Sequence, residues 1–159
     1  MSRFRSLRRV SCLSLPLVVA LLLSTPAAAL DARLGLRASA WLEDADPALG
    51  IEGNFPVGDG RWEIVPNGEI VFGGDRDRWV ASIDLHRFLP RQQELRPYLG
   101  AGLTFVHREG RRGFDDEDDA GINLLGGVEW RRDRWTPFAQ LKVVAADDAE
   151  AVASIGIRF

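Results

Sequence analysis

Cysteine and methionine are almost absent from this chain of 159 residues, which contains one of each. The single cysteine, Cys12, and the single methionine, Met1, both lie in an N-terminal segment that we expect to be removed. The remaining chain then has no disulfide, no thiolate ligand for a metal and no cysteine nucleophile. This absence excludes disulfide-stapled domains, zinc sites that use cysteine, and cysteine-dependent enzymes.

A hydrophobic run long enough for a membrane helix is also missing. The longest apolar stretch, 12–23, falls short of the roughly 20 residues that such a helix needs. Four basic residues precede it: Arg3, Arg5, Arg8 and Arg9. Small residues at 27–29 follow, and this arrangement is typical of a secretory signal peptide. We therefore expect a signal peptide over 1–29 and a single domain over 30–159, with an uncleaved anchor helix as the alternative.

Positive charge is scarce in the expected mature chain. Loss of the four leader arginines leaves 16 of the 20 basic residues against 23 acidic residues, a net charge near −7. Proteins that bind nucleic acid neutralise its phosphates with lysine and arginine, so this balance argues against nucleic acid as a partner.

Apolar residues at helical spacing are missing as well, and apolar and polar residues instead alternate with a period of two. This alternation predicts β-strands, and clusters of Gly, Pro and Asp divide it into eight segments. The predicted strands are 31–42, 50–57, 61–73, 78–88, 97–107, 120–131, 135–145 and 151–159. Most have about the 9 to 11 residues that cross a bilayer when tilted. The pattern predicts an all-β fold, an eight-stranded antiparallel transmembrane barrel.

The alternation leaves open whether the apolar face of the sheet points into a core or out into lipid. A soluble periplasmic barrel of the lipocalin type, with a hydrophobic ligand inside, would have the same pattern. Aromatic side chains near strand ends favour the outward orientation, because membrane barrels carry aromatic girdles at their interfaces. The expected girdle residues are Trp62, Trp79, Trp130, Trp135 and Phe159.

The polar face favours the same orientation, because it contains five basic and five acidic side chains. Charges inside a narrow barrel are tolerated only when they are paired, so this balance predicts a lumen filled by ion pairs. The expected ion-pair residues are Arg33, Arg37, Glu52, Glu63, Glu69, Arg78, Asp84, Glu129, Lys142 and Arg158. Gly100, Gly102 and Gly127 share this face and are expected to make room for the long arginines. Eight strands enclose a space that side chains just fill, so we expect no pore.

Four segments of the chain are similar to a known superfamily. They are 97–103, 121–129, 137–140 and 154–159. They resemble the small outer-membrane β-barrels that include the OmpA barrel domain and OmpX-like proteins. The resemblance implies an up-and-down barrel in the outer membrane of a Gram-negative cell, with both termini in the periplasm. It also implies that Ile155, Ile157 and Phe159 form the assembly signal that the barrel insertion machinery reads.

That topology predicts four long connections facing outward and three short turns facing the periplasm. Counted on the sequence, the charges of the outward connections sum to −10 and those of the turns to +3. A protein that spans two compartments would show such sorting. Pro56 and Pro66 depart from the superfamily pattern, and we expect strand ends or a bulge at these prolines.

The most concentrated charge in the chain is an acidic run. Its residues are Asp115, Asp116, Glu117, Asp118 and Asp119. Carboxylates are ligands for Ca²⁺ and Mg²⁺, but this run lacks the alternating spacing and central glycine of an EF-hand loop. We expect a solvated surface loop, and a weak metal site for divalent ions that bridge lipopolysaccharide phosphates is the alternative.

A lipid-modifying enzyme is another alternative, because barrel enzymes of the outer membrane use a serine and a histidine. His86 shares a face with Ser82, and Asp84 or Glu129 could orient its ring. The His-x-Ser-type motif of the lipid A deacylases is missing, so polar packing in the lumen is expected instead.

The sequence therefore predicts a non-enzymatic outer-membrane barrel in envelope structure or surface interaction through acidic loops. We expect no cofactor and no catalytic residue. The expected partners are outer-membrane lipid, lipopolysaccharide and, during assembly, the insertion machinery, and the chain is expected to be a monomer.

Overall fold

The computed structural model describes residues 32–73, 78–90, 94–108, 117–132, 134–146 and 149–159. These residues belong to the second of the two units into which the chain divides, Asp31–Phe159. The signal peptide expected over 1–29 and its cleavage point lie outside the described residues.

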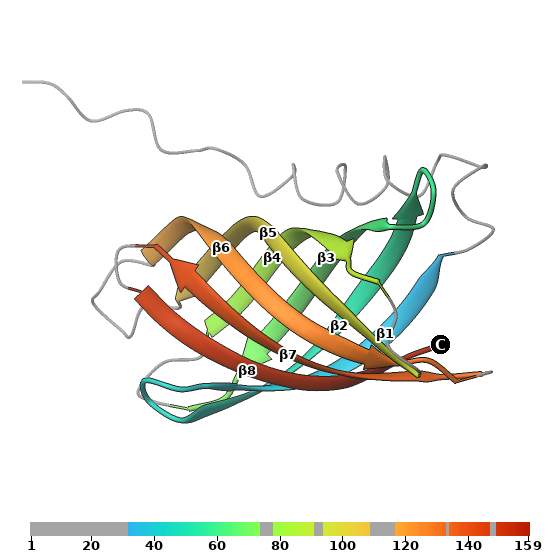
Figure 1. Cartoon of the computed structure of the whole chain (residues 1–159). Coiled ribbons are helices and arrows are strands. Elements are labelled where there is room, and N and C mark those ends of the chain that lie inside the picture. The colour runs from blue at the N-terminus through green and yellow to red at the C-terminus, as the bar shows by residue number, and fades with distance from the viewer. Residues whose placement is uncertain (1–31, 74–77, 91–93, 109–116, 133, 147–148) are drawn as a thin grey trace, which may run out of the picture. The chain divides into compact units, whose positions relative to one another are not determined.

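Eight strands follow one another around a closed barrel, and each pairs antiparallel with its neighbours in the chain (Figure 1). The strands are β1 (Arg33–Trp41), β2 (Asp46–Val57), β3 (Trp62–Val71), β4 (Arg78–Phe88), β5 (Leu95–Arg108), β6 (Glu117–Trp130), β7 (Thr136–Ala145) and β8 (Ala149–Arg158). Pairing of β1 with β8 closes the barrel and removes the edges that an open sheet would expose. The predicted all-β, eight-stranded antiparallel barrel is confirmed.

The barrel has two ends, which we name by what they contain. The terminal rim is the end where β1 begins and β8 ends, and the loop rim is the opposite end. Residues 42–45 connect β1 to β2 at the loop rim, and 58–61 connect β2 to β3 at the terminal rim. These two connections are equal in length, so the expected contrast between long and short connections is wrong for this pair.

Four strands begin earlier than the sequence pattern predicted, and one of them is β5, which begins at Leu95 instead of residue 97. β2 begins at Asp46 instead of residue 50, and β8 begins at Ala149 instead of residue 151. Likewise, β6 begins at Glu117 instead of residue 120. The acidic residues in these stretches were interpreted as loop residues. Ion pairs hold some of them in the barrel wall instead, because a guanidinium nitrogen of Arg78 lies 3.7 Å from the Asp46 carboxylate.

The two prolines lie in strands whose pairing continues past them. Pro56 is the second-last residue of β2, as expected for a strand end, whereas Pro66 lies in the middle of β3 opposite Ile83. The pairs Glu52↔Asn67 and Phe55↔Ile64 flank Pro66 and keep the same register. The strand therefore passes through Pro66 without the extra residue of a bulge, and the expected bulge is wrong there.

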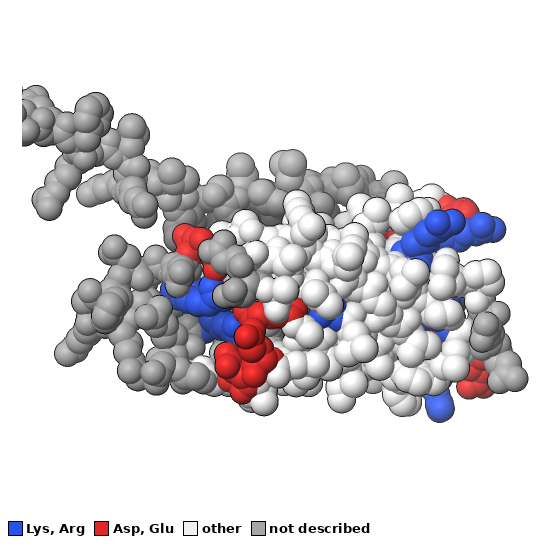
Figure 2. All heavy atoms as spheres, turned by 60° about the vertical axis from the view of Figure 1, so that its left-hand side comes forward, with Lys and Arg blue, Asp and Glu red and all other residues white. Residues whose placement is uncertain are grey.

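The outer wall of the barrel is apolar. Leu34, Leu103 and Ile155 are 72%, 67% and 65% exposed on three different strands. Figure 2 shows charged atoms gathered toward the two ends of the barrel and a largely uncharged belt between them. An outward apolar face contradicts the lipocalin-type alternative, in which the apolar face lines the interior. In the described part of the chain, no helix is long and apolar enough to cross a membrane.

Candidate functional site

The lumen near the terminal rim is filled by charged side chains that the sequence assigned to the polar face. Arg158 donates from Nε to Glu52 Oε1 at 2.6 Å and from Nη1 to Glu129 Oε2 at 2.9 Å. All three of these side chains are fully buried. Arg33 donates to Glu63 Oε1 at 2.8 Å in the same part of the lumen. Pairing is what makes these buried charges tolerable, because an unpaired one would retain its full desolvation cost.

A second layer of ion pairs lies nearer the middle of the barrel. Arg37 Nε lies 2.6 Å from Glu69 Oε1, and Arg37 Nη2 donates to Ser154 Oγ at 2.7 Å. Lys142 Nζ donates to Asp84 Oδ2 at 2.7 Å. The Asp84 carboxylate also accepts hydrogen bonds from two asparagine side chains. With Arg78 at the loop rim, all ten predicted ion-pair residues lie on the inner face.

Arg96 belongs to the same lumen network, although it lies just outside the strand predicted over 97–107. Its Nη1 donates to Glu129 Oε1 at 3.4 Å, and its Nη2 donates to the Gly60 carbonyl oxygen at 2.6 Å. Its guanidinium carbon also lies 3.6 Å from the centre of the Phe88 ring. Extension of the alternation by two residues from Tyr98 would have placed Arg96 on the inner face.

A separate ion-pair cluster closes the loop rim. Arg78 Nη1 lies 3.1 Å from Glu150 Oε2, and Arg108 Nη2 lies 3.4 Å from Glu150 Oε1. Arg108 also pairs with Asp119, and Arg78 with Asp46. Asp46, Asp119 and Glu150 all belong to the predicted outward connections, whose charges sum to −10. Because arginines neutralise them in the barrel wall, the charge presented at this rim is less negative than that count.

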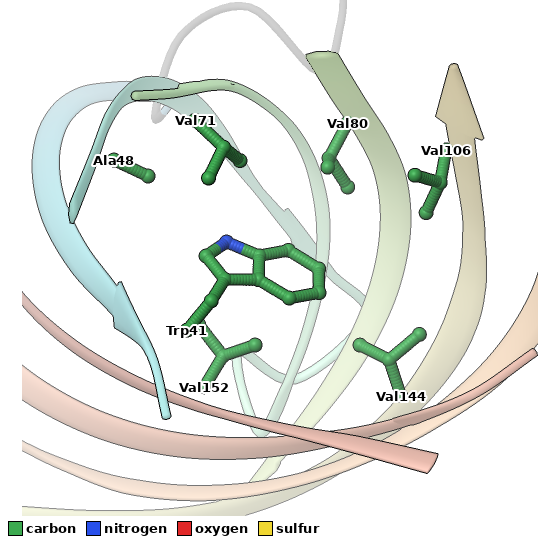
Figure 3. Packing of buried hydrophobic residues seen from close by; sticks show 7 residues of the cluster. All are labelled: Trp41, Ala48, Val71, Val80, Val106, Val144 and Val152. Carbon is green, nitrogen blue, oxygen red and sulfur yellow. The ribbon is translucent and has the colours of Figure 1, made fainter. Parts of the chain in front are cut away.

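An apolar layer lies between the ion pairs of Arg37 and Lys142 and the cluster at the loop rim. It consists of Trp41, Ala48, Val71, Val80, Val106, Val144 and Val152. Figure 3 shows its seven side chains. Trp41 is 2% exposed, and the guanidinium carbon of Arg78 lies 4.5 Å from the centre of its ring. The alternation predicted a polar inner face, but this layer shows that the inner face is not polar throughout. A packed apolar layer excludes water and ions from this part of the lumen.

The lumen glycines make room mainly for aromatic rings and a carboxylate, so the expectation that they accommodate arginines is wrong. A Cβ atom at Gly127 would lie 2.5 Å from Cζ of Tyr98. A Cβ atom at Gly102 would collide with Asp84. A Cβ atom at Gly100 would lie 2.8 Å from Leu125 Cδ1 and 3.1 Å from the His86 ring. An aromatic ring that packs flat against a neighbouring strand needs a position without a Cβ atom, and only glycine provides one.

The structure does not bring the candidate catalytic pair together. The Ser82 hydroxyl is hydrogen-bonded to Thr104 Oγ1 at 3.0 Å, and the His86 ring stacks on Tyr98 with centroids 4.7 Å apart. Ser82 and His86 lie four positions apart on one strand. This spacing separates them by about 13 Å, which is beyond hydrogen-bond reach. Among the described residues, neither ring nitrogen of His86 has a hydrogen-bond partner that would orient it.

The acidic run is divided between strand and undescribed chain. Asp118 Oδ1 lies 2.6 Å from His107 Nδ1, and Asp119 pairs with Arg108. Both acidic residues belong to β6, so the expectation of a loop is wrong for them. Asp115 and Asp116 lie outside the described residues. Within the described ranges, no group of three or more histidine, cysteine or acidic residues is placed to hold a metal ion.

Four exposed aromatic side chains lie at the terminal rim, at the ends of β3, β6, β7 and β8. Trp62 begins β3 and Trp130 ends β6, while Trp135 and Phe159 lie directly outside β7 and β8. These four side chains are exposed on the outer wall. Trp79 lies at the loop rim instead, with its ring centre 5.5 Å from that of Phe105 and 5.2 Å from that of His107.

The expected assembly signal lies on the last strand and just beyond it. Ile155 is exposed on the outer wall, Ile157 is half-buried, and Phe159 is exposed. The Phe159 N–H donates to the Leu34 carbonyl oxygen at 2.8 Å, which fixes the end of the chain against β1. Recognition of these residues by the insertion machinery stays a prediction.

Together, these features define a class of protein: a closed eight-stranded barrel with an apolar wall, an aromatic rim and a lumen filled by side chains. Such an arrangement is typical of small outer-membrane barrels. No family model and no curated protein sequence matches the chain.

Solved structures show the same fold. The N-terminal β-barrel domain of Pseudomonas aeruginosa OprF is similar with a TM-score of 0.69 and 15% identity, over 80% of this chain and 95% of that chain. Neisserial surface protein A (NspA) gives 0.57 and 15%, over 80% and 92%. Ail, the attachment invasion locus protein of Yersinia pestis, gives 0.54 and 14%, over 80% and 96%. The chain thus has the fold of the small outer-membrane barrels, as the resemblance in the sequence implied.

Proposed function

We propose that this chain is an integral outer-membrane protein without enzymatic activity, which serves envelope structure or surface interaction. The observation that carries the proposal is the combination of a belt of exposed apolar side chains with a lumen of paired charges. In water the belt would be a large unfavourable surface, whereas in a bilayer it is the stable arrangement. The similar outer-membrane barrels support the location.

The loop rim supports a role in surface interaction. Glu43 and Asp44 are exposed in the connection between β1 and β2, and Asp118 is exposed at the start of β6. Carboxylates at the level of lipid A phosphates can share divalent cations with them. Lipopolysaccharide and outer-membrane lipid are therefore the proposed partners of this monomeric barrel.

Membrane fractionation and gel mobility test the proposal. The protein is expected to stay with the outer membrane after a carbonate wash, and to migrate differently on a gel when it is left unheated, because the closed barrel resists detergent. Release by carbonate together with heat-independent mobility would contradict the proposed location. An extracellular-protease digestion of intact cells should cut at the loop rim only.

We also propose that the insertion machinery recognises Phe159. The ring is 58% exposed at the end of the closing strand, where a partner can reach it. Phe159→Ala should lower the amount of barrel inserted in cells but leave refolding into detergent unchanged. Leu34→Ala is the control, because Leu34 is 72% exposed at the same rim but lies on β1 instead of at the C-terminal end of the chain. Equal insertion of the two variants contradicts recognition of Phe159.

A further inference from the structure

A pocket with a volume of about 420 Å³ lies at the terminal rim, between the connection from β6 to β7 and the ends of β1 and β8. Five arginines line it: Arg33, Arg131, Arg132, Arg134 and Arg158. Arg33 and Arg158 are already paired with lumen carboxylates, so the exposed Arg131, Arg132 and Arg134 supply its net positive charge. None of the described residues that line it has an acidic side chain, and Asp133 of the same connection lies outside the described residues. Guanidinium groups bind phosphate oxygens in pairs, so the pocket is suited to a phosphate group.

Two aromatic residues place this pocket at the level of lipid headgroups. Trp135 and Phe159 line it and are 44% and 58% exposed. The guanidinium carbon of Arg132 lies 5.6 Å from the centre of the Trp135 ring. Aromatic rings at the end of an apolar wall lie at the boundary between headgroups and acyl chains. An arginine held against such a ring is therefore within reach of a lipid phosphate.

An apolar groove of about 590 Å³ runs along the wall of the same strands. Its floor consists of small residues on β1, β6, β7 and β8: Ala38, Ala40, Gly126, Ala139 and Ala153. At the end of β8, Phe159 lines the pocket and Ile155 lines the groove; both are exposed on the outer wall and lie about 13 Å apart along the strand direction. One leaflet contributes about half of the roughly 30 Å hydrocarbon core, so acyl chains of a lipid whose headgroup fills the pocket reach the groove.

We propose that this side of the barrel binds one anionic glycerophospholipid of the periplasmic leaflet, with its phosphate in the arginine pocket and an acyl chain in the groove. The proposal rests on the proposed outer-membrane location. The positive pocket selects a net negative headgroup such as phosphatidylglycerol over the zwitterionic phosphatidylethanolamine. The groove selects a lipid over a soluble anion, because only a molecule with an acyl chain occupies both.

Native mass spectrometry of the whole barrel tests this proposal. The barrel is released from detergent that contains equal amounts of phosphatidylglycerol and phosphatidylethanolamine with the same acyl chains. One phosphatidylglycerol is expected to remain bound. The double variant Arg132→Gln/Arg134→Gln should weaken this binding about 30-fold. Arg61→Gln/Arg87→Gln is the matched control, because it also removes two positive charges from the terminal rim but outside the pocket.

The groove is tested separately. Ala139→Leu places a larger side chain on its floor and should weaken phosphatidylglycerol binding, whereas inorganic phosphate should not displace the lipid. Equal losses of phosphatidylglycerol binding in the pocket variant and the control variant would mean that the total charge of the rim, and not the pocket, attracts the lipid. That result would overturn the site. If inorganic phosphate displaces phosphatidylglycerol and Ala139→Leu has no effect, the pocket binds a free anion. That result would overturn the proposal that it binds a lipid.

Failure of the proposed function is distinguishable from failure of the site. Each variant is first checked for the gel shift of the unheated barrel after refolding in vesicles. A barrel that does not insert contradicts the proposed location. A barrel that inserts and shows no preference for phosphatidylglycerol overturns the lipid site alone.

Discussion

At the scale of single residues, arginines organise the lumen by joining carboxylates from different strands. Arg37 on β1 lies 2.6 Å from Glu69 on β3 and 3.6 Å from Glu52 on β2. Arg37→Met keeps much of the side-chain volume but leaves two buried carboxylates without this partner. We expect the free energy of unfolding to fall by about 3–5 kcal/mol, measured by urea titration of the barrel in lipid vesicles.

The matched control removes an arginine from an exposed pair. Arg61 pairs with Asp59 on the connection between β2 and β3, and their side chains are 76% and 61% exposed. Because water already solvates both groups, Arg61→Met should change the free energy of unfolding by about 1 kcal/mol or less. Equal losses for Arg37→Met and Arg61→Met would show that the lumen pairs are not what stabilises the barrel.

Alternation predicted which charged residues face the lumen but not the partner that each one contacts. Its period of two is a property of the extended backbone, so the side of the barrel wall that Arg37 or Asp84 faces follows from the sequence. The pairing of Arg158 with Glu52 joins the last strand to the second, and depends on register and on barrel closure. Trp41 lies on the inner face, but the apolar layer around it cannot be read from charge balance.

At the scale of strands, adjacent glycines of β6 face opposite sides of the wall. A Cβ atom at Gly127 would lie 2.5 Å from the buried Tyr98 ring, whereas one at Gly126 would lie 3.3 Å from a flexible methyl group of Leu99. Gly127→Val should therefore destabilise the barrel by about 1–3 kcal/mol or more, while Gly126→Val remains close to wild type. The midpoint temperature of the unheated-to-heated gel shift measures both.

The opposite ranking of these two variants would mean that β6 faces the other way, since a slip by one residue exchanges the two sides of a strand. The side of the wall that each strand residue faces was predictable, but the residues at which β2, β6 and β8 begin were not. Acidic residues such as Asp46 and Glu150 look like loop residues in a sequence. Their arginine partners lie on other strands, so only the folded barrel shows that they continue the wall.

At the scale of the whole molecule, the lumen is filled at three successive levels: the ion pairs of Arg158 near the terminal rim, those of Arg37 and Lys142, and the apolar layer around Trp41. A cavity of only about 10 Å³ lies between the last two levels. That volume is about the smallest that holds a single water molecule. The two layers close the barrel by different means, since one excludes water and the other fills the space with paired charges.

These three filled levels predict that the barrel does not conduct ions in planar bilayers. Trp41→Ala removes the largest side chain of the apolar layer and should lower the free energy of unfolding by about 3–5 kcal/mol. It should still not conduct, because the ion pairs of Arg37 and Lys142 remain in place. Trp41→Ala combined with Arg37→Ala should also give no conductance, because Arg158 still joins Glu52 and Glu129 near the terminal rim. Steps of porin size from the unmodified barrel would contradict a filled lumen, and any steps from the double variant would show that the terminal-rim ion pairs do not close it alone.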